Sequence, residues 1–67
     1  MKLGENIRRK RLECDLEQQE LAKRVGVNKS CICQYEKGIR CPSVGVLCKI
    51  ADTLQCSLDE LRGKKVS

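Results

Sequence analysis

The apolar residues of this chain recur with the spacing of α-helices, and short segments with glycine or polar residues separate the periodic stretches. The clearest example runs from Gln18 to Val25, where Leu21, Ala22 and Val25 give a helix one apolar face. Gly26 follows directly and can adopt the left-handed conformation that ends a helix without a steric penalty. We therefore predict a short helix over residues 18–25 that packs through one face.

A second helix is predicted from about Lys29 to Lys37, with Gly38 as its stop. Asn28 immediately precedes it, and the Asn28 side-chain oxygen can accept hydrogen bonds from the first free N–H groups of that helix. Two short helices joined by a three-residue turn have the organisation of a helix-turn-helix unit.

The two faces of this second helix differ in chemistry when its residues are projected at about 100° per residue. The side that can pack against the preceding helix carries Cys31, Ile32 and Tyr35. The other side has two cations and no carboxylate, and consists of Lys29, Ser30, Cys33, Gln34 and Lys37. An outward polar face is most often simply solvated, but the second helix of a helix-turn-helix is the one that enters the major groove of DNA. This position favours a DNA-contacting role.

Three further helices complete the prediction of an all-α domain. The first is predicted over residues 3–13, and its inward side consists of Leu3, Ile7, Arg11 and Cys14. A fourth helix begins after Ser43 as its cap, and its apolar side consists of Val44, Leu47, Ile50, Ala51 and Leu54. Ser57 and Glu60 form a capping box that opens a last short helix, which ends at Gly63.

The size and charge of the chain limit its organisation. Its 67 residues suffice for one domain, predicted over residues 1–63, and residues 64–67 are expected to form a frayed basic tail. The net charge of +5 permits binding to nucleic acid or another anionic surface without requiring it. No apolar run approaches the roughly 20 residues of a membrane span, and the first residues lack the apolar stretch of a signal peptide. We therefore expect a cytoplasmic protein that does not bind a membrane.

Many residues between about Leu3 and Arg62 match one known pattern at the same time. They are Ile7, Arg11, Leu16 to Ala22, Gly26 to Asn28, Ile32, Tyr35 to Gly38, Arg40, Pro42, Leu47, Ile50, Ala51, Leu54 and Ser57 to Leu61. Through these residues the chain resembles the Cro/phage-repressor-type helix-turn-helix domains, also called the xenobiotic-response-element family. The resemblance implies a compact five-helix, lambda-repressor-like DNA-binding domain with a central helix-turn-helix.

The resemblance also implies roles for individual residues. Arg11 and Glu36 occupy positions that typically form an ion pair between the first and third helices, and two independent surface charges are the alternative. The residues that match phosphate ligands of the family are Gln18, Lys37 and Arg40. Leu58 and Leu61 lie in a region that helps many members to form a two-fold dimer, and closure of the monomer's own core is the alternative.

Six cysteines are unusual in a chain of this length, and several roles compete for them. A zinc site is disfavoured, because the closest pair, Cys31 and Cys33, lies about 200° apart around a helix and the chain has no histidine. A disulfide framework is disfavoured because nothing indicates secretion. Cys14 and Cys56 stand where members of the resembled family have apolar core residues, and Cys48 lies beside the apolar side of the fourth helix. These three are expected to fill or border the core as small apolar residues. Cys33 and Cys41 are expected to be exposed, and thiol-based redox sensing through Cys33 stays an alternative.

We therefore expect a transcriptional regulator, of the repressor type, that binds specific sequences in double-stranded DNA as a homodimer on a palindromic operator. The residues expected to contact base edges are Lys29, Ser30 and Gln34, with Cys33 as an apolar contact. Lysine can donate to guanine, and glutamine can pair with adenine through two hydrogen bonds. The two half-sites should lie about 34–36 Å apart.

Two other classes of function compete with DNA regulation. A protein-interaction module, such as an antitoxin or anti-repressor, could use the same fold to bind a protein partner. An enzyme is not supported, because the sequence has no histidine, no serine or cysteine nucleophile with an evident base, and no phosphate-binding glycine loop. We accordingly expect no cofactor, no metal site and no small-molecule substrate.

Overall fold

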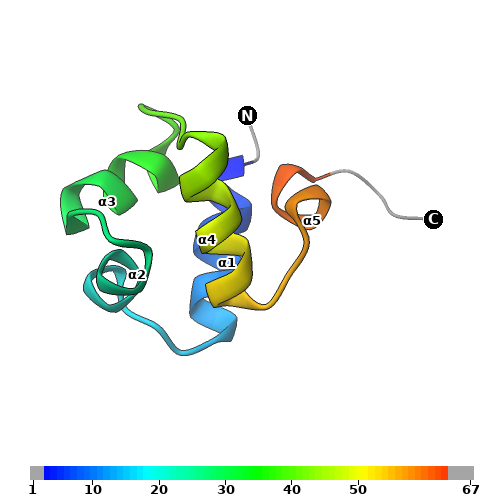
Figure 1. Ribbon diagram of the computed structural model, residues 1–67, viewed down its shortest axis with the longest axis horizontal. Coiled ribbons are helices and arrows are strands. Elements are labelled where there is room, and N and C mark those ends of the chain that lie inside the picture. The colour runs from blue at the N-terminus through cyan, green and yellow to red at the C-terminus, as the bar shows by residue number, and fades with distance from the viewer. Residues whose placement is uncertain (1–2, 64–67) are drawn as a thin grey trace.

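The computed structural model describes residues 3–63 and folds this part of the chain into five helices without a strand (Figure 1). They are α1 (Leu3–Glu13), α2 (Gln18–Val25), α3 (Lys29–Lys37), α4 (Val44–Leu54) and α5 (Leu58–Arg62). The prediction of an all-α, five-helix domain is confirmed. The predicted tail over residues 64–67 lies outside the described residues. None of the described helices combines the length and apolarity needed to cross a membrane.

The ends of the helices follow from local chemistry. Gly26 and Gly38 both adopt the left-handed conformation, with φ of 83° and 76°, and close α2 and α3. The Ser43 hydroxyl accepts from the Val46 N–H at 3.3 Å, as predicted for the cap of α4. The predicted side-chain cap at Asn28 is wrong, because its side chain makes no such bond. The Asn28 main-chain carbonyl instead accepts from the first turn of α3, including the Cys31 N–H at 3.0 Å.

Each helix contributes one fully buried side chain to a single core. These five side chains are Ile7, Leu21, Ile32, Ile50 and Leu61. Leu61 therefore closes the core of the monomer, which was the alternative to a dimer contact for this residue. Leu58 is only half-buried. With Tyr35 as the one aromatic side chain, this core is almost wholly aliphatic.

Three residues expected to face inward are exposed instead. Val44 is 66% exposed, because it is the first residue of α4 and precedes the part of that helix that packs on its neighbours. Cys14 follows the last residue of α1, and its thiol reaches the Leu54 carbonyl oxygen at 3.7 Å without entering the core. Cys48 also lies on the exposed side of α4, whereas Cys56 is half-buried.

The backbones of α1 and α3 approach each other closely at Gly4. A Cβ atom on Gly4 would lie 2.6 Å from the Glu36 carbonyl oxygen and would also collide with the Tyr35 carbonyl oxygen. Real Cβ atoms do not approach backbone oxygens this closely, so glycine is required for the two helices to touch here. No periodicity or motif in the sequence predicts this contact.

A buried ion pair fixes α3 against α1. The Arg11 Nε donates to Glu36 Oε2 at 2.7 Å, and the Arg11 Nη2 donates to Glu36 Oε1 at 3.2 Å. The Arg11 and Glu36 side chains are only 8% and 4% exposed. Arg11 also donates to the Leu16 carbonyl at 2.7 Å, and Gln18 donates to Glu36 Oε1 at 3.1 Å. The pair that the resemblance implied is thus present, and it extends to the start of α2.

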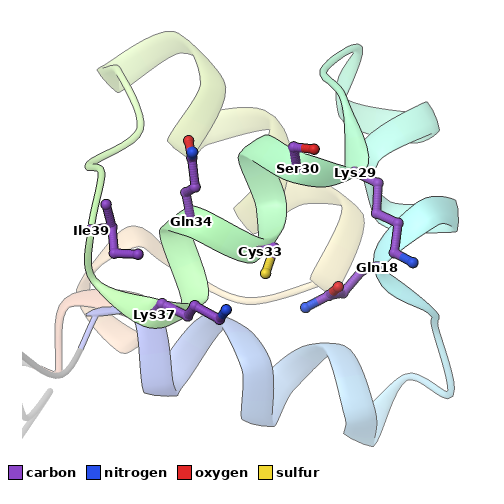
Figure 2. A pocket seen from close by; sticks show the side chains of 7 residues that line it. All are labelled: Gln18, Lys29, Ser30, Cys33, Gln34, Lys37 and Ile39. Atoms are coloured by element: carbon purple, nitrogen blue, oxygen red, sulfur yellow. The ribbon is translucent and has the colours of Figure 1, made fainter.

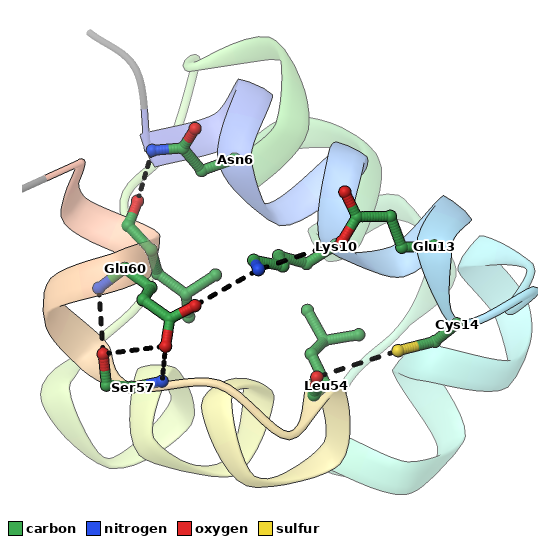
Figure 3. Close-up of polar contacts among 8 residues, drawn as sticks. Asn6, Lys10, Glu13, Cys14, Leu54, Ser57 and Glu60 are labelled. Atoms are coloured by element: carbon green, nitrogen blue, oxygen red, sulfur yellow. Dashed lines mark hydrogen bonds and ion pairs between the residues drawn. The ribbon is translucent and has the colours of Figure 1, made fainter.

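Polar contacts hold α5 against α1 (Figure 3). The Asn6 side chain is buried and donates to the Leu61 carbonyl at 2.9 Å, and Lys10 lies 3.2 Å from the Glu60 carboxylate. Glu60 also accepts from the Ser57 N–H at 3.4 Å, and its own N–H donates to the Ser57 hydroxyl, which completes the predicted capping box. The hydrogen bond and charge of Lys10 lower the pKa of Glu60, and Glu60 in turn raises the pKa of Lys10.

Replacement of Gly4 by alanine should destabilise the fold by about 1–3 kcal/mol, because the new methyl group forces α1 away from the backbone of α3. Urea unfolding followed by circular dichroism measures the change. Gly45→Ala is the matched control, because a Cβ at Gly45 would meet no atom within 4 Å. Since helix propensity alone then acts, Gly45→Ala should stabilise the fold by about 0.5–1 kcal/mol. If Gly4→Ala and Gly45→Ala changed the free energy of unfolding in the same direction, the close approach at Gly4 would be contradicted.

Removal of the charge of Glu36 should destabilise the fold by about 3 kcal/mol, because Glu36→Gln leaves the buried Arg11 cation uncompensated. The Glu13→Gln variant provides the control, since Glu13 is 58% exposed and lies 3.8 Å from Lys10. Its effect should stay within about 0.5 kcal/mol. Equal unfolding midpoints for the two variants would show that the Arg11–Glu36 pair does not anchor α3.

The Lys10–Glu60 bridge should make stability depend on pH in a defined window. Because the pKa of Glu60 is lowered from its ordinary 4.5, the bridge contributes fully above about pH 4.5 and its contribution is lost as the pH falls through the lowered value. Glu60→Gln retains a residue that can complete the capping box. Melting temperatures at low salt should therefore show wild type above the variant at pH 7 and the gap closing towards pH 3. If the difference in melting temperature between wild type and Glu60→Gln were the same at pH 7 and pH 3, the bridge would not contribute to stability.

Candidate nucleic-acid interface

The outward side of α3 forms one wall of an open hollow of about 550 Å³ (Figure 2). Side chains from α2, from α3 and from the loop after α3 line it. They are Gln18, Lys29, Ser30, Cys33, Gln34, Lys37 and Ile39. Six of these seven residues are among those that the sequence nominated for base or phosphate contacts, so the fold brings the nominated residues together on one surface.

The side chains of α3 divide between this hollow and the core as the helical projection predicts. Ile32 and Tyr35 are buried, and Cys31 is half-buried against the same core. On the opposite side Lys29, Ser30 and Lys37 are exposed, whereas Cys33 and Gln34 are half-buried. Cys33 is thus less exposed than expected, because it lies at the floor of the hollow between longer side chains (Figure 2).

Gln18 lies at the rim of the hollow because the buried ion pair holds its side chain. Its Nε2 donates one hydrogen to Glu36 and has a second hydrogen available to another acceptor. Gln18 is also the first residue of α2, where backbone N–H groups have no partner within the helix. A side-chain donor and a helix N-terminus therefore face the same rim, an arrangement that suits an anion.

The electrostatics of the hollow favour a polyanion. Lys29 and Lys37 supply two cations at opposite ends of α3, and none of the described lining residues is acidic. Arg40, the third nominated phosphate ligand, does not line the hollow; it is exposed in the loop that follows α3. The Arg40 backbone N–H donates to the Gln34 carbonyl at 3.3 Å, which keeps this part of the loop against the end of α3.

Ile39 is a lining residue that sequence reasoning missed. It is 71% exposed and stands directly after the Gly38 stop of α3. A single apolar residue in a polar loop is a weak signal, because isolated exposed aliphatic side chains are common on protein surfaces. Only its place beside Gln34 in the folded chain connects it with the hollow (Figure 2).

All six cysteines are free thiols. Cys41 is exposed as predicted, and burial raises the pKa of the half-buried Cys56 thiol. Within residues 3–63 no group of three or more cysteine, aspartate or glutamate side chains is arranged to hold a metal ion. Cys33 is the one cysteine that lines the hollow.

Comparison with known proteins agrees with this geometry. The helix-turn-helix family model matches residues 7–61 of the chain. The transcriptional repressor RstR of the cryptic phage CTXphi, from Vibrio cholerae serotype O1, is 34% identical over 64 residues. This match covers 96% of the chain but 57% of RstR, so the chain spans little more than half the length of that relative.

Two solved structures are similar over nearly the whole chain. The P22 c2 repressor, crystallised in complex with a synthetic operator, has a TM-score of 0.87 at 36% identity and is matched over 91% of this chain and 92% of its own. The restriction-modification controller protein C.AhdI from Aeromonas hydrophila has a TM-score of 0.84 at 32% identity, with coverage of 90% and 91%. With a family match over residues 7–61 and these relatives, the chain belongs to the Cro/C1-type helix-turn-helix family.

Proposed function

We propose that this chain is a transcriptional regulator that binds specific sequences in duplex DNA by placing α3 in the major groove. The observation that carries the proposal is the hollow in front of α3, where hydrogen-bonding side chains lie between two lysines and no acidic residue intervenes. The P22 c2 repressor, which has the same fold, was solved with a synthetic operator, and this supports the same mode of binding here.

Base recognition is assigned to the side chains that project from α3. Gln34 can donate to and accept from the edge of adenine, and Lys29 can donate to guanine O6 or N7. Ser30 can bond to several bases, so it contributes least to selectivity. Cys33 offers an apolar contact at the floor of the hollow.

Phosphate binding is assigned to the residues at the edges of the hollow. Gln18 offers its amide and the N-terminus of α2, and Lys37 and Arg40 offer cations at the far end of α3 and in the following loop. Such contacts raise affinity and fix the register of α3 on the duplex, but carry no sequence information themselves. Binding should therefore weaken steeply as the salt concentration rises.

We further propose that the chain acts as a homodimer on a palindromic operator, with half-sites about 34–36 Å apart. We assign the dimer contact to the half-buried Leu58 of α5 rather than to Leu61, because Leu61 is fully buried in the core. Residues 1–63 would form the whole DNA-binding domain, with residues 64–67 as a basic tail. Since RstR and the P22 c2 protein are named repressors, repression is the proposed outcome, in the cytoplasm and without enzymatic activity.

Selection of bound sequences from a random duplex library at near-physiological salt tests the proposal. The wild-type protein should recover one palindromic motif. Gln34→Ala should relax selectivity at one position in each half-site and cost about 1–3 kcal/mol against the preferred base, because the adenine edge loses its partner. Lys49→Ala, an exposed substitution on α4 outside the hollow, should leave the motif unchanged.

Recovery of no motif would contradict DNA regulation and favour the protein-interaction module as the function of this fold. A motif that Gln34→Ala leaves unaltered would contradict the assignment of α3 residues to bases. Repetition with alkylated protein addresses the thiol-sensor alternative, since unchanged affinity would show that Cys33 has no such role.

A further inference from the structure

Ile39 presents a large apolar side chain to the surface that is proposed to face DNA. The side chain is 71% exposed and borders the same hollow as Gln34 (Figure 2). Val44 is similarly exposed, at 66%, but does not line the hollow. Exposure alone therefore does not distinguish Ile39; its position among the hydrogen-bonding groups does.

The backbone fixes Ile39 relative to the end of α3. The Gly38 N–H donates to the Tyr35 carbonyl at 3.2 Å, and the Ile39 N–H donates to the Gln34 carbonyl at 3.0 Å. With Gly38 at φ 76°, these two bonds form a Schellman motif. The loop therefore begins with a defined geometry, which holds Ile39 close to Gln34.

The helix residues that could cover Ile39 in this motif leave most of its side chain exposed. In Schellman motifs the residue after the glycine frequently packs on the helical residue whose carbonyl it bonds, or on the residue before that one. Here these two residues are Gln34, which is polar, and Cys33, which is small and half-buried, and Ile39 stays largely exposed. The isoleucine side chain is therefore available for an apolar group outside the chain.

The major groove of DNA displays one such apolar group, the C5-methyl group of thymine. Adenine displays N7 and N6 at the same edge, which a glutamine amide can bond through two hydrogen bonds. An amide and an aliphatic side chain held next to each other thus match the two halves of an A·T pair, or of adjacent A·T pairs.

We propose that Ile39 is a specificity-determining residue that contacts a thymine methyl group beside the adenine bound by Gln34. This inference rests on the proposed function and adds the base class that the hollow prefers, which is an A·T step at the end of α3. Cys33 is the other apolar group in the hollow and is the competing candidate for the same methyl group.

Replacement of each thymine of the selected duplex by deoxyuridine tests the proposal, because this change removes only the methyl group. Affinities are measured with the full chain as wild type, Ile39→Ala, Val44→Ala and Cys33→Ser, and melting curves establish that each variant is folded. Wild type should lose about fourfold in affinity at one thymine per half-site, the amount expected for one buried methyl group. Ile39→Ala should bind the thymine and deoxyuridine duplexes equally at that position, whereas Val44→Ala should keep the wild-type difference.

Each other outcome overturns the proposal in a recognisable way. If wild type selects a motif but Ile39→Ala keeps the full methyl sensitivity, or if Cys33→Ser alone abolishes it, Ile39 does not contact the methyl group. If wild type selects a motif that contains no methyl-sensitive thymine, the A·T preference is wrong while DNA binding stands. If wild type selects no motif at all, the proposed function fails together with this inference.

Discussion

The carboxylate of Glu36 is the point on which the geometry of this protein depends. It receives Arg11 from α1 and Gln18 from α2, while its own backbone belongs to α3. Both charged side chains are almost fully buried, so each requires the other to offset the loss of water. One bidentate pair therefore sets the orientation of α3 and holds Gln18 at the rim of the hollow.

Only a small core is available to support the arrangement of the helices around this ion pair. The core is small and aliphatic, and a chain of this size buries only about 60% of its unfolded surface. The orientation of the helices is therefore set by specific contacts as well as by apolar burial. Gly4 lets α1 and α3 touch, and Asn6 and Lys10 of α1 hold α5. A surface that must present side chains to bases benefits from this rigidity, because hydrogen-bond readout requires fixed geometry.

The surface in front of α3 separates two tasks that DNA binding requires. Lys37 and the N-terminus of α2 lie at its edges, where they can attract phosphates irrespective of sequence. Hydrogen-bonding and apolar side chains lie between them, where base edges would be presented. Under the proposed function, changes at a few positions such as Lys29, Gln34 and Ile39 would alter which operator this surface selects.

The helices and the division of α3 into two faces could be predicted from local patterns in the sequence. Helical spacing, the Gly26 and Gly38 stops and the Ser43 and Ser57 caps act within a few residues, so they can be recognised without tertiary contacts. The Arg11–Glu36 pair was accessible only through family resemblance, because nothing local joins residues 25 positions apart.

The remaining features depend on contacts between helices and loops that are distant in sequence. Whether Val44 is buried, whether Gly4 touches α3, and whether Ile39 faces solvent or the hollow depend on neighbours distant in sequence. A periodic pattern specifies which side of a helix is apolar but not where packing begins, and it gives no position for a loop residue. These features follow from how the helices pack against one another, and the buried contacts between the helices determine that packing.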